Sequence, residues 1–500
     1  MTGRHHAARV RRLLTAALLG PVLAACGSTV EAGQQATGGG GLSYAGGAAG
    51  TNSGGAPSST GNGAGFAPGA VGAPGGPSYV GNGTAPGASG TSTVGGTNPS
   101  QGATSAGGHD TSAIRVGFEL IQGGNQIVAQ GLGTPVNFGD GKAEVTGIVN
   151  DINKHGGING RHIQPYFGNW NAASGDNGRQ ADCTQLTEDD HVSFIITVVN
   201  MSAEYVACAA QHHVPIINAS FGAGDDYMYR QFPLYLYTAS LMSLNKEEQL
   251  VLTTGRGSGR VSTSRRVGVV IDNTPPGDPQ YDRVLNATVA PTLKAWGIPY
   301  ETFSVATQGD VNNAVLRFRA DGVKTVVFIA PSGIIEILFM QAAEQQQWRP
   351  DYILGDSTDP WFIGEAAPTA QVQHITGAGS LPVSNVPESQ YPTTAREKQC
   401  FAVIRAAGET NTNRHSSLTA TPYCEATWEF VAVASKVVGA LTPVSYFNAY
   451  SQVGTSFDPV TTFAINFANG RHTGAARYRT LGYASQCQCI TYTSGLRPIP

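Results

Sequence analysis

Charged side chains are scarce in this 500-residue chain, in which only 13% of the residues are Asp, Glu, Lys or Arg. The net charge is −4, so there is no excess of Lys and Arg to neutralise the phosphates of a nucleic acid, and no nucleic-acid partner is expected. Between Glu31 and Asp110 there is no charged residue at all, and this segment holds 26 of the 65 glycines. Such a composition cannot bury enough apolar surface to offset chain entropy, so the segment is expected to be disordered.

Long apolar runs and common catalytic motifs are also absent. No stretch of 18 or more apolar residues occurs, so no membrane-spanning helix is predicted. The sequence has no GxSxG, HExxH or Walker A motif, and GRGSGR at 255–260 lacks the flanking strand and helix of a dinucleotide-binding loop. These absences predict a protein that is not an enzyme and carries no cofactor. A hydrolase whose catalytic site has no recognised motif is the open alternative.

The N-terminus has the pattern of an exported protein. Four arginines within the first 12 residues precede the apolar run LLTAALLGPVLAA, which is too short to remain as a membrane span. The run ends in Leu-Ala-Ala-Cys, which resembles the lipobox of bacterial lipoproteins. That resemblance implies a signal peptide at 1–25 and a lipid on Cys26, while a plain signal peptide with a chance cysteine is the alternative. Residues 26–112 would form a tether with an r.m.s. reach of about 50 Å.

Six cysteines remain besides Cys26, an even number that favours disulfides in an exported chain. Their order in the sequence predicts two pairs, Cys183–Cys208 and Cys400–Cys424. Cys487 and Cys489 are only two residues apart, so a bond between them needs a local kink in the strand. A metal site is the other interpretation of this pair, but no His or acidic residue lies nearby in the sequence, and we predict no metal.

From residue 113 onward, short apolar runs alternate with helical patterns. IRVGFELI, VSFIITVV, RVGVVID and TVVFIAP are each typical of a buried strand, and amphipathic segments of about 10 to 15 residues separate such strands. This alternation predicts right-handed β-α-β units around a parallel sheet.

Two series of these units predict an α/β protein with two doubly wound, Rossmann-like lobes and a cleft between them. The second series is followed by further helical segments, so we expect several chain crossings to form a hinge. The expected division is lobe 1 at about 113–238 plus 360–440, and lobe 2 at about 239–359 plus part of 441–500.

The segment INKHGGINGRHIQPYFGNWN at 152–171 resembles the first helix, turn and strand of the type I periplasmic binding proteins, with GGINGR as the sharpest motif. Weaker similarities follow in the order of that family, among them VPIINAS at 214–220 and VGVVIDNTPPGDPQYDRVLNATVAPTLKAWG at 267–297. The family includes receptors for branched-chain amino acids and amides, and the resemblance covers essentially all of 113–500. Two loops depart from its pattern: the one after the first strand, and Gly168–Asn171, where the family usually has acidic residues.

The resemblance implies a ligand between the lobes, which close around it by a hinge motion. Ligands of open α/β sheets bind at the carboxyl ends of the strands, so the loops there supply the candidate contacts. These candidates are Trp170, Asn200, Ser202, Ala219, Ser220, Phe221, Asp272, Tyr281, Ser332 and Asp356. Asp272 and Asp356 compete as the partner of a ligand ammonium, and Trp170 and Tyr281 are candidate walls. Ser202, at a helix start, would bind a ligand carboxylate or act as a plain helix cap.

These features predict a lipoprotein on the extracytoplasmic face of the cell membrane that captures a small polar solute, of the amino acid or amide class, for an ABC importer. The expected partners are the solute, the permease and ATPase subunits, and the membrane through the lipid on Cys26. A receptor that passes the ligand signal to a membrane kinase or channel is the main alternative, and a lipid-anchored hydrolase is a weaker one.

Overall fold

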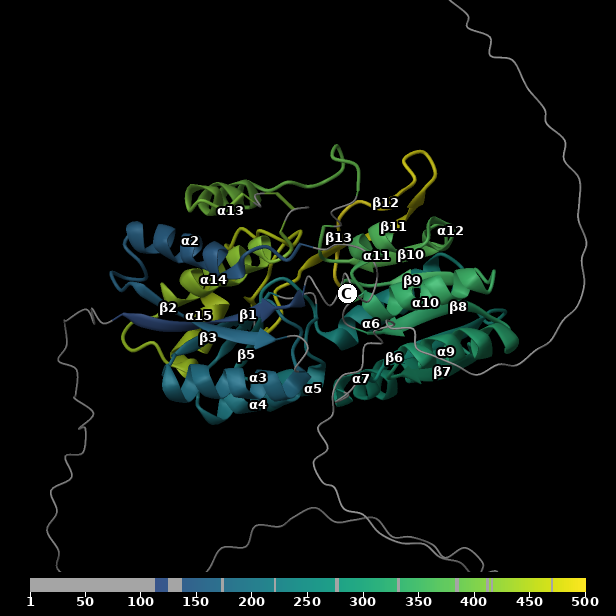
Figure 1. Ribbon diagram of the computed structural model, residues 1–500, viewed down its shortest axis with the longest axis horizontal. Coiled ribbons are helices and arrows are strands. Elements are labelled where there is room, and N and C mark those ends of the chain that lie inside the picture. Colours follow the sequence, from purple (N-terminus) through teal and green to yellow (C-terminus); the bar gives the residue numbers. More distant parts are fainter. Residues whose placement is uncertain are drawn as a thin grey trace, which may run out of the picture. The chain divides into compact units, whose positions relative to one another are not determined.

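Figure 1 shows the chain in a computed structural model. The structure describes residues 113–124, 137–171, 175–219, 222–274, 278–330, 333–382, 386–410, 413–414, 417–468 and 471–500. The predicted signal peptide, the lipidation site Cys26 and the predicted tether lie outside these residues.

The first lobe is built on a five-stranded, fully parallel sheet in the order β2-β1-β3-β4-β5. Its strands are β1 (Ile114–Gln122), β2 (Ile163–Asn171), β3 (Phe194–Thr197), β4 (Ile216–Asn218) and β5 (Leu236–Thr238). The central strand β3 reads Phe-Ile-Ile-Thr and is buried along its whole length. A parallel strand that is covered by helices on both faces has this uninterrupted apolar sequence.

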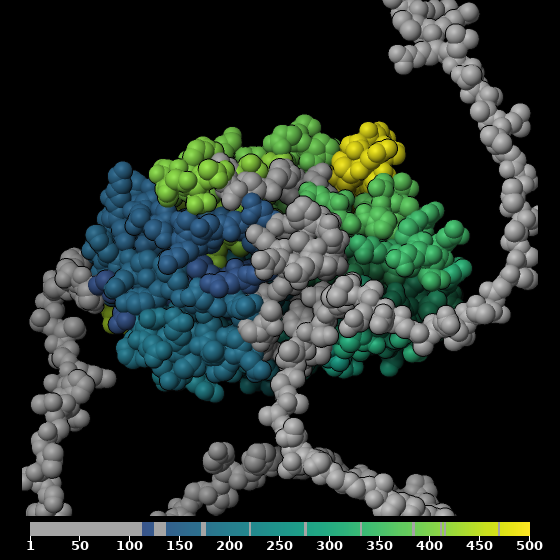
Figure 2. Space-filling view, in the orientation of Figure 1, coloured from purple at the N-terminus to yellow at the C-terminus, as the bar shows by residue number. Residues whose placement is uncertain are grey.

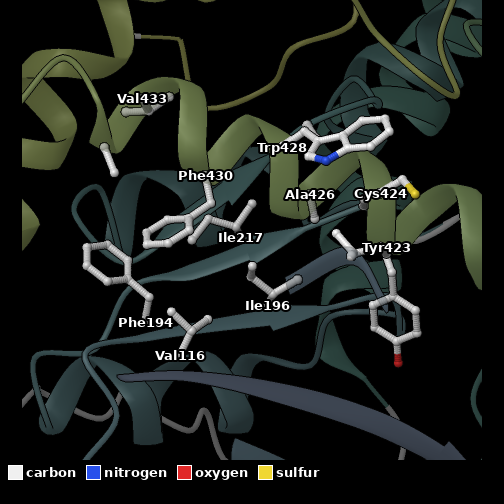
Figure 3. Close-up of a cluster of buried hydrophobic side chains, with 14 of the residues drawn as sticks. Val116, Phe194, Ile196, Ile217, Tyr423, Cys424, Ala426, Trp428, Phe430 and Val433 are labelled. Atoms are coloured by element: carbon white, nitrogen blue, oxygen red, sulfur yellow. The ribbon is translucent and has the colours of Figure 1, made fainter. Parts of the chain in front are cut away.

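Helices cover both faces of the first sheet because successive side chains of a strand point to opposite sides. Phe194 and Ile196 pack with α14, and Figure 3 shows them facing its Phe430, whereas Ile195 packs on the other face with residues of α3 and α4. The rings of Phe194 and Phe430 lie 4.9 Å apart. The helices of this lobe are α2 (Gly141–Lys154), α3 (Gly175–Thr184), α4 (Ala203–Gln211), α5 (Asp226–Gln231), α13 (Ala395–Ala406), α14 (Ala420–Ala434) and α15 (Pro443–Val453).

The second lobe has a mixed sheet in the order β12-β11-β10-β9-β8-β6-β7, with β13 paired to β11. Its strands are β6 (Arg266–Asp272), β7 (Tyr300–Val305), β8 (Val323–Ile329), β9 (Asp351–Leu354), β10 (Ile375–Gly379), β11 (Arg477–Ala484), β12 (Cys489–Tyr492) and β13 (Arg497–Pro498). Strands β6 to β10 are parallel, and β11 and β12 add an antiparallel hairpin at one edge. The predicted α/β class with two doubly wound lobes is therefore confirmed.

Seven helices cover the second sheet within the described residues. They are α6 (Leu244–Gly257), α7 (Pro279–Val284), α8 (Ala290–Ala295), α9 (Gln308–Ala320), α10 (Ile334–Gln345), α11 (Pro360–Ala366) and α12 (Thr369–Val372). Two π-helical turns, Gln185–Asp189 and Leu285–Val289, continue α3 and α7. Among the helices of the described ranges, none has the length and apolar character needed to cross a bilayer.

The chain passes between the two lobes three times: between β5 and α6, between β10 and α13, and between α15 and β11. This differs in detail from the expected division. The segment Pro360–Gly379 belongs to the second lobe, because β10 pairs with β9 and Phe362 and Ile375 pack in the core of that lobe. Helix α15 belongs to the first lobe, since Tyr446 packs in the first core.

All six cysteines of residues 113–500 are joined in pairs. One disulfide joins α3 to α4 and a second joins α13 to α14, while the third closes the turn between β11 and β12. The bonded pairs are Cys183–Cys208, Cys400–Cys424 and Cys487–Cys489.

Candidate functional site

A pocket lies between the two lobes, next to the carboxyl ends of β4, β9 and β10. The space between its walls is about 750 Å³, a figure that includes open solvent. This is the position at which open α/β sheets bind ligands. Its walls include Ala219, Ser240, Asp356, Asp359, Pro360, Trp361, Leu381, Pro382, Tyr391, Glu397, Arg414, Ser417, Leu418, Thr421, Pro422, Val460 and Thr461.

Asp356 is the predicted ligand residue that the second lobe contributes to this pocket. One carboxylate oxygen accepts hydrogen bonds from the backbone N–H and the hydroxyl of Ser380, at 2.6 and 2.7 Å, and the other accepts from the Leu381 N–H at 3.1 Å. Burial nevertheless raises the pKa of Asp356 to about 6. A Cβ on Gly379 would lie 2.0 Å from Asp356 Oδ1, so only glycine leaves room for the carboxylate.

A second buried carboxyl, Glu247 of α6, lies beneath the same loop. It accepts hydrogen bonds from the backbone N–H and the hydroxyl of Ser357, each at 2.7 Å. Burial, followed by repulsion from Asp356, raises the pKa of Glu247 to about 8. Gly355 makes space for it, because a Cβ there would lie 2.2 Å from Glu247 Oε1.

Asp359 completes the acidic side of the pocket. It is 7% exposed, and among the described residues its Oδ1 atom has no hydrogen-bond partner. Burial, then the charges of Asp356 and Glu247, raise the pKa of Asp359 well above its ordinary value, while a hydrogen bond from Trp361 opposes the shift. The backbone of Asp359 is in the left-handed region, at φ 48°, which Asp adopts more readily than most residues other than glycine.

The first lobe contributes a cation, Arg414, to the pocket lining. The Arg414 guanidinium stacks on the ring of Tyr391, 3.7 Å from its centroid, and forms an ion pair with Glu388. The Tyr391 hydroxyl donates to Glu397 at 3.2 Å. These contacts fix the orientation of Arg414 at the pocket wall.

The pocket lining therefore includes the buried carboxyls of Asp356 and Asp359 from the second lobe, together with the Arg414 guanidinium and the buried Glu397 carboxyl from the first. A small solute with an amino group and a carboxylate would find a partner for each charge, and burial makes such pairing necessary. The rings of Trp361 and Tyr391 add apolar surface to the lining.

Of the ten predicted ligand residues, Ala219 and Asp356 line this pocket. Ser220, Phe221 and Ser332 lie outside the described residues. The other five have positions that the structure defines and that are not part of the pocket wall described above: Trp170, Asn200, Ser202, Asp272 and Tyr281.

Ser202 and Asn200 belong to the loop after β3, which contacts the second lobe. Ser202 caps α4 and accepts a hydrogen bond from the Tyr205 N–H at 3.4 Å, as in the helix-cap alternative. The Asn200 carbonyl accepts from Arg179 at 2.5 Å. Between these two residues, the Met201 carbonyl accepts from Gln280 of α7 at 2.9 Å.

A second contact between the lobes lies beside this one. Arg283 of α7 forms an ion pair with Asp225, the cap of α5, with 2.6 Å between Nε and Oδ2. The side chain of Asp225 is 2% exposed and that of Arg283 is 28% exposed. We call the Arg283–Asp225 pair and the Gln280–Met201 bond the interlobe latch.

Asp272, Tyr281 and Trp170 have local partners. Asp272 accepts from the backbone N–H and the hydroxyl of Thr274, at 2.9 and 2.6 Å, and it is Asp356 rather than Asp272 that lines the pocket described above. The prediction of Tyr281 as a cleft wall is corrected, because its ring is 6% exposed within the core cluster that covers β6. Trp170 is half-buried, 5.6 Å from the Arg179 guanidinium.

Sequence reasoning missed Asp359, Glu247, Tyr391 and Arg414. The spacing of Asp356 and Asp359 directly after a strand could have drawn attention to Asp359. No pattern marked Tyr391 or Arg414, since both lie on irregular segments that only the fold brings to the cleft. Within the described ranges, no three His, Cys, Asp or Glu side chains are grouped so that they could hold a metal ion.

Two lobes with parallel sheets, three chain crossings and a pocket at the strand ends define the fold of the type I periplasmic binding proteins, as the GGINGR segment predicted. No family model matches the sequence, and no curated protein is similar to it at a significant level.

Solved structures provide the comparison. The branched-chain amino acid transporter substrate-binding protein LivJ of Streptococcus pneumoniae, solved with isoleucine, is 16% identical with a TM-score of 0.55 over 77% of this chain and 99% of its own. The leucine-binding protein LivK of Thermotoga maritima is 10% identical with a TM-score of 0.56, over 77% and 98%. A solute-binding protein of an ABC transporter from R. palustris, solved with 4-hydroxybenzoate, is 12% identical with a TM-score of 0.57, over 78% and 98%.

Proposed function

We propose that the chain is the solute-binding component of an ABC importer and captures a small zwitterionic solute of the amino acid or amide class. The observation that carries the proposal is the pocket between the lobes, whose lining includes Asp356 and Asp359 of the second lobe and Arg414 of the first. The fold is shared with binding proteins described for branched-chain amino acids and aromatic acids. The protein itself performs no covalent chemistry in this proposal.

We further propose that a lipid on Cys26 holds the protein at the extracytoplasmic face of the cell membrane. The Leu-Ala-Ala-Cys sequence and the uncharged segment after it support this part. One acyl chain anchors only marginally and two or three anchor stably, so replacement of the single acylated cysteine should free the protein. We expect Cys26→Ser to move the protein from the membrane fraction to the medium, and retention at the membrane would contradict the anchor.

The ligand proposal is tested by thermal shift of the full mature chain against amino acids, amides, urea, polyamines and aromatic acids. A ligand at 100 times its Kd stabilises the folded protein by about 2.7 kcal/mol, a shift of several degrees. Asp356→Asn should abolish the shift for amino compounds. Lys246→Gln, an exposed residue of α6, is the control and should retain it.

Calorimetry separates a cationic ligand from a neutral one. Burial raises the pKa of Asp356 to about 6 and raises that of Asp359 well above its ordinary value, so part of the carboxyl population holds protons before binding. An ammonium group would displace those protons, and the measured enthalpy would then vary with the ionisation enthalpy of the buffer. The zwitterion proposal would be contradicted by a ligand that binds without proton release, or by binding that is confined to uncharged solutes.

A further inference from the structure

The third disulfide differs from the other two in the properties that govern reactivity. Cys487 and Cys489 are two residues apart, whereas the other pairs are separated by 25 and 24. The four cysteines of those other pairs are at most 3% exposed. Cys487 is exposed and Cys489 is half-buried.

The Cys487–Cys489 disulfide contributes little to the stability of the hairpin. The β11–β12 hairpin is already held by its ladder, in which Leu481 pairs with Tyr492 and Ala484 pairs with Cys489. A disulfide stabilises mainly by closing a loop in the unfolded chain, and the effect is smallest when the loop is this short.

The turn also carries backbone strain at the residue between the two cysteines. Gln488 has φ 53°, in the left-handed region that a residue other than Gly, Asn or Asp seldom adopts. Opening the disulfide would remove one constraint that holds Gln488 in this conformation. Disulfides that are exposed or strained are the ones that exchange readily with thiols.

The hairpin is accessible to another molecule. Strand β12 is the last strand of its sheet, with no further strand beside it among the described residues. Figure 1 shows the turn between β11 and β12 extending from this edge, and Figure 2 shows this part of the chain, in yellow, at the molecular surface. A thiolate can therefore approach Cys487 Sγ from solvent.

We propose that the Cys487–Cys489 disulfide is a thiol–disulfide exchange site that accepts two electrons from a dithiol, while the two buried disulfides stay intact. One thiolate of the dithiol attacks Cys487 Sγ, a new S–S bond forms, and the old bond breaks with its electron pair on Cys489, which takes up a proton. The second thiolate of the dithiol then attacks its own mixed disulfide. It releases Cys487 as a thiolate and leaves the partner oxidised.

The test treats the full mature protein with graded dithiothreitol at neutral pH, quenches with an alkylating agent and locates the label by peptide mass spectrometry. We expect Cys487 and Cys489 to be labelled at least about tenfold faster than the four buried cysteines, since reactivity follows access. Simultaneous labelling of all six, slower labelling of this pair, or free thiols before any reductant is added would each overturn the proposal.

Two single variants test which sulfur is attacked. Cys489→Ser leaves the exposed Cys487 without its resolving partner, so glutathione disulfide should convert it to a lasting mixed disulfide. The matched variant Cys487→Ser leaves the half-buried Cys489, which should react several-fold more slowly. Equal rates would contradict attack at Cys487.

A structural role is distinguished by the melting temperature. The double variant Cys487→Ser/Cys489→Ser should keep Tm within about 2 °C of the parent, while Cys400→Ser/Cys424→Ser should lower it by more than about 5 °C. Equal losses for the two double variants would show that the hairpin bond is structural.

Discussion

At the scale of single residues, Gly379 determines whether Asp356 can occupy its place at the pocket. A Cβ at position 379 would lie 2.0 Å from Asp356 Oδ1, so Gly379→Ala must displace the carboxylate from Ser380. We expect a loss of about 1–3 kcal/mol in the free energy of unfolding, measured by denaturant titration. Gly257→Ala is the control, because a Cβ there meets nothing within 4 Å, and it should leave stability unchanged or slightly raised.

The pH dependence of stability should report the buried carboxyls. The pKa values of Asp356 and Glu247 are raised by burial to about 6 and about 8 in the folded state, so the folded protein binds more protons than the unfolded chain. Their contribution is therefore fully present below about pH 4 and is lost as pH rises towards 8. Glu247→Gln should flatten this fall in unfolding free energy by an amount on the order of 5 kcal/mol.

Glu344 provides the control for the pH experiment. Hydrogen bonds from Arg349, then from Gln371, lower the pKa of this exposed-face carboxyl to about 2, so its contribution is lost only as pH falls below about 4. Glu344→Gln should leave the slope between pH 5 and 8 as it is in the parent. A parent whose stability rises between pH 5 and 8 would contradict the raised carboxyl pKa values.

Site residues could be predicted from the sequence only where they lie at the end of a recognisable strand. Asp356 is the last residue of the segment YILGD at 352–356 and follows strand β9 by two residues, and its place at the carboxyl end of that strand made it a candidate. Arg414 follows no strand, and its neighbours Glu388 and Tyr391 are more than 20 residues away in the sequence. No local pattern encodes a contact of that kind.

At the scale of secondary-structure elements, the start of α9 is fixed by reciprocal hydrogen bonds. The Thr307 side chain accepts from the Asp310 N–H, and the Asp310 carboxylate accepts from the Thr307 N–H at 2.9 Å. Thr307→Ala should cost about 1 kcal/mol of unfolding free energy. Thr253→Ala, an exposed threonine within α6, is the matched control and should cost nothing, because alanine is the better helix former.

Elements with a clear hydrophobic period were predictable from the sequence. Strands β1 and β6 match the expected segments IRVGFELI and RVGVVID to within one residue. Strand β5 is only three residues long and so has no measurable period, and the β11–β12 hairpin has half-buried rather than alternating positions. The formation of β5 and of the β11–β12 hairpin depends on neighbouring strands that are already in the sheet.

At the scale of the whole molecule, the interlobe latch should stabilise the contact between the lobes. Arg283→Ala removes the ion pair with Asp225 and leaves that buried carboxylate without its cation, although it still accepts from the Met228 N–H at the start of α5. A loss of 1–2 kcal/mol changes the ratio of closed to open forms by about 5- to 30-fold. We expect a larger radius of gyration for the ligand-free variant in small-angle X-ray scattering.

Arg349→Ala is the control for the latch variant, because the Arg349 ion pair with Glu344 lies entirely within the second lobe. Its scattering profile should match that of the parent. If Arg283→Ala also gave the parent profile, the latch would have no part in lobe closure.

Because the chain crosses between the lobes, folding of the first lobe depends on segments that are synthesised late. The first sheet uses residues from Ile114 to Thr238, yet α14, which covers one of its faces, begins only at Ala420. The Tyr423 hydroxyl donates to the Glu119 carbonyl across 304 residues of sequence. A chain that is synthesised from its N-terminus therefore exposes strands β1, β3 and β4 on that face while residues 244–379 of the second lobe emerge. Contacts this distant in sequence form slowly, so the last hundred residues decide when the first lobe is protected from aggregation and proteolysis.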